Sequence, residues 1–182
     1  MDLLILFLLL LIIIICLIVA TYAYLYNKFQ DVIIRINEVE ATIDTNLRNK
    51  YDLLNKSISI IKGNVKIEDD IFDEIVKLRS RKISNFDLDR KLILAFNEFN
   101  SVKSQNKELN KSEELNKIEK DIEDIDNKLT TFREYYNENI TKYNRLVKAF
   151  PTNIIALTNK YEEKLFFDRK DMNDEDYNDF KL

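Results

Sequence analysis

The chain has one glycine and one proline, Gly63 and Pro151, among its 182 residues. A sheet protein needs Gly, Pro and similar turn residues at every hairpin, and this chain cannot supply them. The composition therefore predicts an all-α protein. The chain also has no His and only one Cys, which excludes Ser-His and Cys-His catalytic pairs, Cys/His zinc cages and Gly-rich phosphate loops. We therefore expect no catalytic, cofactor-binding or metal-binding residues.

An unbroken apolar run extends from Leu3 to Ala20 without a charge. At about 1.5 Å per residue this run forms a helix of roughly 27 Å, close to the thickness of a bilayer's hydrocarbon core. Tyr22, Tyr24 and Tyr26 follow it, where aromatic side chains gather at a membrane interface. A cleaved signal peptide is the main alternative, but the run is longer than usual for a signal and no basic residue precedes it. We expect a transmembrane helix with Cys16 as a thiol inside the membrane.

Charges around the apolar run predict the orientation of the chain. Lys28 and Arg35 follow the run, and no basic residue precedes it. The positive-inside rule then places the N-terminus outside and the C-terminal domain in the cytoplasm. We expect residues 1–26 to be a transmembrane anchor, residues 27–167 a soluble helical bundle, and residues 168–182 an acidic, flexible tail. Basic and acidic residues are interleaved elsewhere, so we expect no nucleic-acid binding.

Apolar residues recur every three or four positions along four segments of the remaining chain, as is typical of helices with one buried face. The first segment runs from Asn27 to Lys62, and Gly63 is expected to end it in the left-handed conformation. Two shorter helices are expected next. One lies at about 67–82, and the other starts at the polar break 84–87, which holds several possible N-caps, and runs to about Glu108.

Ser112 can cap the last long helix, Glu113 to Ala149. This helix has the most regular apolar stripe, so Leu129 and Phe132 should be core anchors. Pro151 cannot continue a helix and should end it, and the two residues after Pro151 are candidate caps of a short following helix. The predicted fold is a transmembrane helix followed by an antiparallel bundle of two long and two shorter helices.

Helix lengths predict an uncovered region in this bundle. The two long helices are each about 55 Å long, and the shorter ones are roughly 25 and 30 Å. The halves nearest the membrane, 27–43 and 132–150, should then form a two-helix stalk with partly uncovered apolar faces. Residues 154–167 are expected to cover the stalk or to dip into the lipid interface. Otherwise a protein partner or a second copy should bind there.

Two stretches, 40–63 and 132–156, carry a pattern beyond helical periodicity. Their distinguishing residues are Ala41, Asp44, Leu47, Asp52, Leu53, Gly63, Arg133, Tyr136, Asn137, Tyr143, Asn144, Phe150, Pro151, Asn153 and Ala156. With the N-terminal span, these stretches resemble the LemA family of bacterial membrane proteins over nearly the whole chain. The resemblance implies one transmembrane helix in the bacterial cell membrane, a helical bundle usually placed in the cytoplasm, and no established biochemical activity.

Four polar residues of these stretches are candidates for a cluster between the first and last long helices: Asp44, Asp52, Arg133 and Asn137. Buried polar groups of this kind fix the register of helices and are costly to leave unpaired. Exposure to solvent and a ligand site are the alternatives.

Three functions are compatible with the sequence. The first is a non-enzymatic interaction or scaffold protein, which binds the lipid bilayer and a protein partner or second copy through its membrane-proximal helices. The second is a signalling or stress-response membrane protein that switches on binding a lipid, ligand or partner. The third is an enzyme that uses only carboxylates, Lys, Ser, Thr or Tyr, and it needs a concave pocket that slim bundles seldom have. We expect the first.

Overall fold

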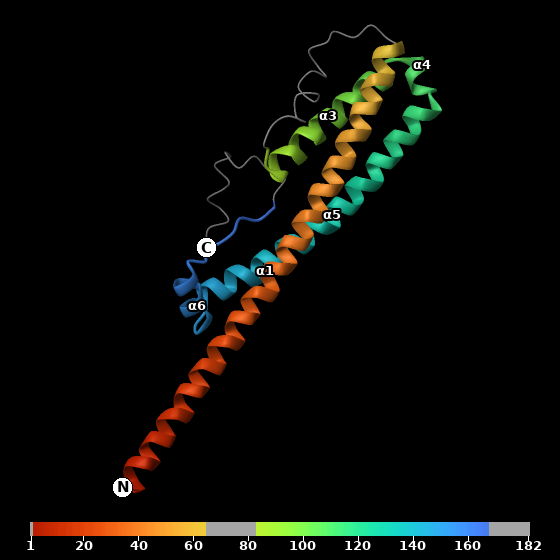
Figure 1. Ribbon diagram of the computed structural model, residues 1–182. Helices are drawn as coiled ribbons and strands as arrows, with labels where there is room; N and C mark the ends of the chain where they lie inside the picture. Colours follow the sequence, from red (N-terminus) through yellow and green to blue (C-terminus); the bar gives the residue numbers. More distant parts are fainter. Residues whose placement is uncertain (1, 65–82, 168–182) are drawn as a thin grey trace, which may run out of the picture. The chain divides into compact units, whose positions relative to one another are not determined.

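The computed structural model describes residues 2–64 and 83–167 (Figure 1). Every regular element in these ranges is a helix, which confirms the predicted all-α fold. The helices are α1 (Asp2–Asn64), α3 (Asn85–Gln105), α4 (Lys107–Asn110), α5 (Glu113–Lys148) and α6 (Thr152–Asn159). The short helix expected at about 67–82 and the acidic tail at 168–182 lie outside the described residues.

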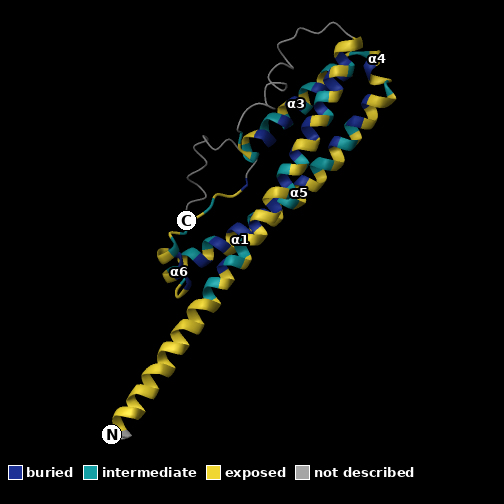
Figure 2. Cartoon of the chain, viewed as in Figure 1, coloured by how far each residue is buried: buried dark blue, intermediate teal, exposed yellow. Residues whose placement is uncertain are grey.

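α1 is a single helix of 63 residues that contains both the apolar run and the first amphipathic segment. It continues because neither Gly nor Pro occurs before its last turn. The side chains of the apolar run are exposed, whereas a buried stripe begins at Phe29 and continues along the helix (Figure 2). The first part of α1 is therefore apolar and exposed, whereas the second part packs into a core.

The end of α1 differs from the prediction for Gly63. Gly63 does not have a positive φ, and α1 includes it and ends one residue later, at Asn64. The side-chain amide of Asn64 donates a hydrogen bond to the carbonyl of Ile60 at 2.8 Å. This bond adds a contact to the last turn. The end of α1 agrees with a stop at Gly63 and Asn64, whereas the left-handed conformation predicted for Gly63 is wrong.

The described chain divides into two compact units, and α1 and α5 contribute to both. Met1–Glu38 and Tyr136–Phe166 form the first, which we call the N-terminal unit. Val39–Tyr135 and Phe167–Leu182 form the second, which we call the central unit. Each unit has its own buried side chains, so each is described by itself.

The core of the central unit comes from α1, α3, α4 and α5. Its fully buried apolar side chains include Ile43, Leu47, Leu54, Ile61, Leu92, Phe99, Leu115, Ile122 and Leu129. Two serines cap helices as their sequence positions predict: Ser84 Oγ accepts from the backbone N–H of Asp87 at 3.2 Å, and Ser112 Oγ from that of Leu115 at 3.4 Å. Each cap satisfies a donor that the first helical turn leaves unpaired.

Of the two core anchors predicted on α5, only one is fully buried. Leu129 is 0% exposed, whereas Phe132 is half-buried. The buried stripe steps from Leu129 to Arg133 and then to Tyr136, so Phe132 lies at its edge. The prediction for Phe132 is wrong because the arginine after it takes the inward position.

The core of the N-terminal unit is built around Phe29. Its ring meets that of Tyr143 edge-on, with 6.1 Å between centroids, and lies 5.3 Å from that of Tyr161. Gln30 Nε2 donates to the Tyr161 hydroxyl at 2.9 Å. These contacts hold the segment after α6 against α1, so part of the segment predicted to cover the stalk does so.

The junction between α5 and α6 contains the Phe150–Pro151 peptide bond, which is cis. α5 ends at Lys148, as the position of Pro151 predicts. Pro151 itself is the residue before α6, and no side chain caps that helix. Thr152 is instead the first helical residue, and its hydroxyl donates back to the carbonyl of Ala149 at 2.8 Å. The capping role predicted for the two residues after Pro151 is therefore wrong.

Candidate functional site

The apolar half of α1 has the properties of a membrane anchor. Among the described residues, α1 is the one helix long and apolar enough to cross a membrane, and the apolar stretch is not buried inside the protein. Leu3, Cys16 and Ala20 are all exposed. Tyr22 stacks on Tyr26 with 6.4 Å between ring centroids. An exposed apolar helix of this length suits the hydrocarbon core of a bilayer, which makes it a candidate membrane span.

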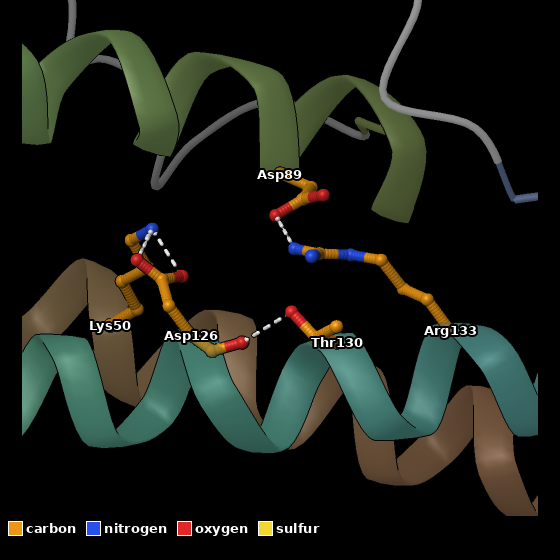
Figure 3. A network of polar contacts seen from close by, with 5 residues as sticks. All are labelled: Lys50, Asp89, Asp126, Thr130 and Arg133. Carbon is orange, nitrogen blue, oxygen red and sulfur yellow. Dashed lines mark hydrogen bonds and ion pairs between the residues drawn. The ribbon is translucent and has the colours of Figure 1, made fainter.

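A fully buried lysine lies in the central unit. Lys50 of α1 is 0% exposed, and its Nζ bonds both carboxylate oxygens of Asp126 of α5, at 2.6 and 2.8 Å (Figure 3). The same Nζ lies 5.6 Å from the centroid of the Phe96 ring of α3. The Thr130 hydroxyl donates to the backbone carbonyl of Asp126 at 3.0 Å. This ion pair therefore joins two helices inside the unit.

A second buried ion pair joins α5 to α3. Arg133 Nη2 donates to Asp89 Oδ1 at 2.5 Å, and the two residues are 5% and 1% exposed (Figure 3). The guanidinium also lies 5.7 Å from the ring centroid of Phe167. Further along the unit, Lys103 of α3 pairs with Glu119 of α5. Three pairs thus connect α5 to α1 and α3, and a buried charge without its partner is costly.

Lys50 should make the free energy of unfolding increase with pH. Burial lowers the pKa of Lys50, although Asp126 opposes the shift. Between the folded pKa and the ordinary lysine value of about 10.4, the unfolded chain then binds more protons than the folded chain, and stability increases with pH. Denaturation in detergent across this range should show the wild type gaining stability relative to Lys50→Met. A difference in stability that does not change with pH, or a wild type that loses stability relative to Lys50→Met as the pH rises, would contradict the assignment.

The motif residues fall into three groups by burial. The buried members are Leu47, Arg133, Tyr136, Tyr143 and Ala156. The half-buried members are Asp44, Leu53, Asn137, Asn144 and Asn153. The exposed members are Ala41, Asp52, Gly63, Phe150 and Pro151.

The polar cluster predicted between the first and last long helices does not form as expected. Asp44 pairs with Arg48 one turn along α1, at 2.8 Å and on the surface. Asp52 is exposed, and Arg133 takes Asp89 of α3 as its partner. Arg133 does have a buried partner, but this partner, Asp89, belongs to α3 and not to the first long helix.

Asn144 fastens the segment after α6 to α5 in the N-terminal unit. Its Nδ2 donates to the backbone carbonyl of Lys164, and its Oδ1 accepts from the backbone N–H of the same residue, both at 2.9 Å. Lys148 and Glu163 add an ion pair at 3.0 Å. Burial, together with neighbouring Tyr161, raises the pKa of the Tyr143 hydroxyl. These contacts give Asn144 and Tyr143 a structural role.

Lys50, Asp126 and Asp89 were not among the residues that the sequence singled out. A signal for Lys50 was present, because the apolar stripe of α1 skips from Leu47 to Leu54 and Lys50 lies in the gap. A charge at an inward position of a helix needs a buried partner. Within the described residues, no group of three or more His, Cys, Asp or Glu side chains is placed to hold a metal ion.

Comparison with known proteins identifies the family. No curated protein matches the chain. The model of the LemA family matches residues 39–178, which is most of the sequence and includes both motif stretches. The matched range contains the ion pairs of Lys50, Arg133 and Lys103 in the central unit, whereas Phe29 precedes it. The chain belongs to the LemA family.

Proposed function

We propose that the protein is a single-pass membrane protein that holds partner proteins at the bacterial cytoplasmic membrane and has no enzymatic activity of its own. The observation that carries this proposal is the composition of α1. Its first part is apolar and exposed, and its second part forms the core of a helical domain. An anchor that continues directly into a packed domain keeps that domain next to the bilayer. Membership of the LemA family supports membrane association.

Proximity labelling in the native membrane tests this function. A labelling enzyme is fused to the C-terminus of the full chain and, as a matched control, to residues 1–26 alone. We expect the full chain to enrich a set of neighbours that the anchor alone does not, and to stay in the membrane during extraction with alkaline carbonate. Identical neighbour sets would contradict the proposed interaction function. Release of the protein by carbonate would contradict the proposed membrane anchor.

The helical domain should face the cytoplasm, because Lys28 and Arg35 follow the span and no basic residue precedes it. A variant with Cys16→Ala and Asn178→Cys carries its one thiol in the acidic tail. In intact spheroplasts this thiol should resist a membrane-impermeant maleimide, and it should react once the membrane is opened. Prompt labelling of intact spheroplasts would reverse the orientation, while the opened sample shows that the thiol is reactive.

A further inference from the structure

The outer face of α6 and the turn before it form an apolar surface within the N-terminal unit. Phe150 is 81% exposed, Leu157 78% and Ile154 49%. Figure 2 shows exposed as well as buried residues along α6. The opposite face of the same short helix is already packed, because Ile155 and Ala156 are buried. No charged residue occurs from Ala149 to Asn159. An uncharged helix with apolar side chains on both faces is unusual at a surface in contact with water.

The pairing of α1 with α5 shows which residues of α1 lie at the same height as this surface. The contact between Phe29 and Tyr143 places these two residues side by side, and within this unit the two helices run in opposite directions (Figure 1). α5 continues for five residues beyond Tyr143, to Lys148, which is about 7.5 Å at the helical rise. The same distance back along α1 from Phe29 leads to Tyr24. The turn that carries Phe150 therefore starts level with the tyrosines that follow the apolar run.

The other end of α6 is also located by contacts. Tyr161, two residues after α6, lies against Phe29 and accepts a hydrogen bond from Gln30. α6 thus occupies the stretch between the levels of Tyr24 and Gln30. Tyr22 and Tyr24 are 44% and 69% exposed, and tyrosines at the end of a membrane span mark the boundary between acyl chains and headgroups.

We propose that Phe150, Ile154 and Leu157 insert into the bilayer interface and form a second membrane contact beside the anchor. The inference rests on the proposed function, since it requires the apolar run of α1 to cross the membrane. Lipid is the occupant because this surface is level with the end of the exposed apolar run of α1. Interfacial helices bury one apolar face by about 5–10 Å. Lys28 and Lys160 are exposed next to this region and suit anionic headgroups.

Depth measurements on the full chain test the inference. The protein carries Cys16→Ser and one new Cys with an environment-sensitive fluorophore, and it is reconstituted in vesicles of phosphatidylcholine and phosphatidylglycerol. Leu157→Cys reports on the proposed contact, Ile12→Cys on the anchor, and Ser104→Cys, an exposed position of the central unit, on water. Leu157 is exposed, so its replacement removes little packing and should not unfold the protein.

A lipid contact predicts a distinct result at each position. The label at Leu157 should be quenched by a nitroxide near the top of the acyl chains, and the label at Ile12 by one deeper in the bilayer. Quenching by aqueous iodide should be several-fold weaker at Leu157 than at Ser104. A repeat with Phe150→Cys should behave like Leu157.

Three outcomes would overturn the inference, and each is distinguishable. If Ile12 is quenched by lipid and Leu157 is as open to iodide as Ser104, the anchor stands and α6 does not touch lipid. If Leu157 is shielded from iodide but neither nitroxide quenches it, protein covers the face, and crosslinking between labelled positions would identify a second copy. If lipid quenches neither Ile12 nor Leu157, the anchor itself fails, and the inference fails with it.

Discussion

Asp89→Asn should lower the free energy of unfolding by about 3–5 kcal/mol, because it leaves the guanidinium of Arg133 buried without a counter-charge. Both residues are almost completely buried, and the bond between them is short. Within the described residues, Nε and Nη1 of Arg133 are buried without a hydrogen-bond partner. Asp89 is therefore the acceptor on which this arginine depends, and removing its charge removes the compensation.

Two further variants separate this effect from a general loss of acidic charge. Asp44→Asn breaks the exposed pair with Arg48 and should cost far less than Asp89→Asn, because solvent screens that pair. The double variant Asp89→Leu with Arg133→Met replaces both charges by apolar groups and should recover most of the stability. Denaturation in detergent measures all three. A loss below about 1 kcal/mol for Asp89→Asn, or a double variant less stable than Asp89→Asn, would show that the pair does not set the fold of this unit.

Phe29→Ala should also cost about 3–5 kcal/mol, since it empties the centre of the N-terminal unit. Phe29 is 0% exposed and contacts the rings of Tyr143 and Tyr161. Removing the ring loses its buried area and its edge-on contact, and it loosens the segment after α6 from α1. The substitution should accordingly accelerate hydrogen exchange more in residues 152–166 than in the central unit.

Phe150→Ala is the matched control, because it removes the same side chain from an exposed position in the same unit. Phe150 is 81% exposed, so its truncation should change stability in detergent by less than about 0.5 kcal/mol. Equal effects at Phe29 and Phe150 would contradict the assignment of Phe29 as the centre of the core. Unchanged exchange in residues 152–166 after Phe29→Ala would show that other contacts hold that segment.

Features that depend on neighbours along the chain could be predicted from the sequence. The apolar run, the helical periodicity, the caps at Ser84 and Ser112, and the end of the last long helix before Pro151 are all of this kind. Each follows from the geometry of one helix or one turn, in which the partner atoms lie within four residues. The all-α fold and the candidate anchor are sums of such local properties.

Tertiary packing decided which charges are buried and which side of each helix faces inward. The sequence marked Arg133 but not its partner, because Asp89 is far away in the chain. The sequence around a carboxylate that becomes buried also does not differ from that around a solvated one. Phe132 fitted the periodic stripe, yet packing turned Arg133 inward instead. From the sequence, residues 154–167 could lie against α1 or in lipid. The contacts of Tyr161 with Phe29 and Gln30 place one side of this segment against α1. The physical reason is that local periodicity selects a face of a helix, whereas the energy of a buried charge or an aromatic contact depends on a partner that only the folded chain supplies.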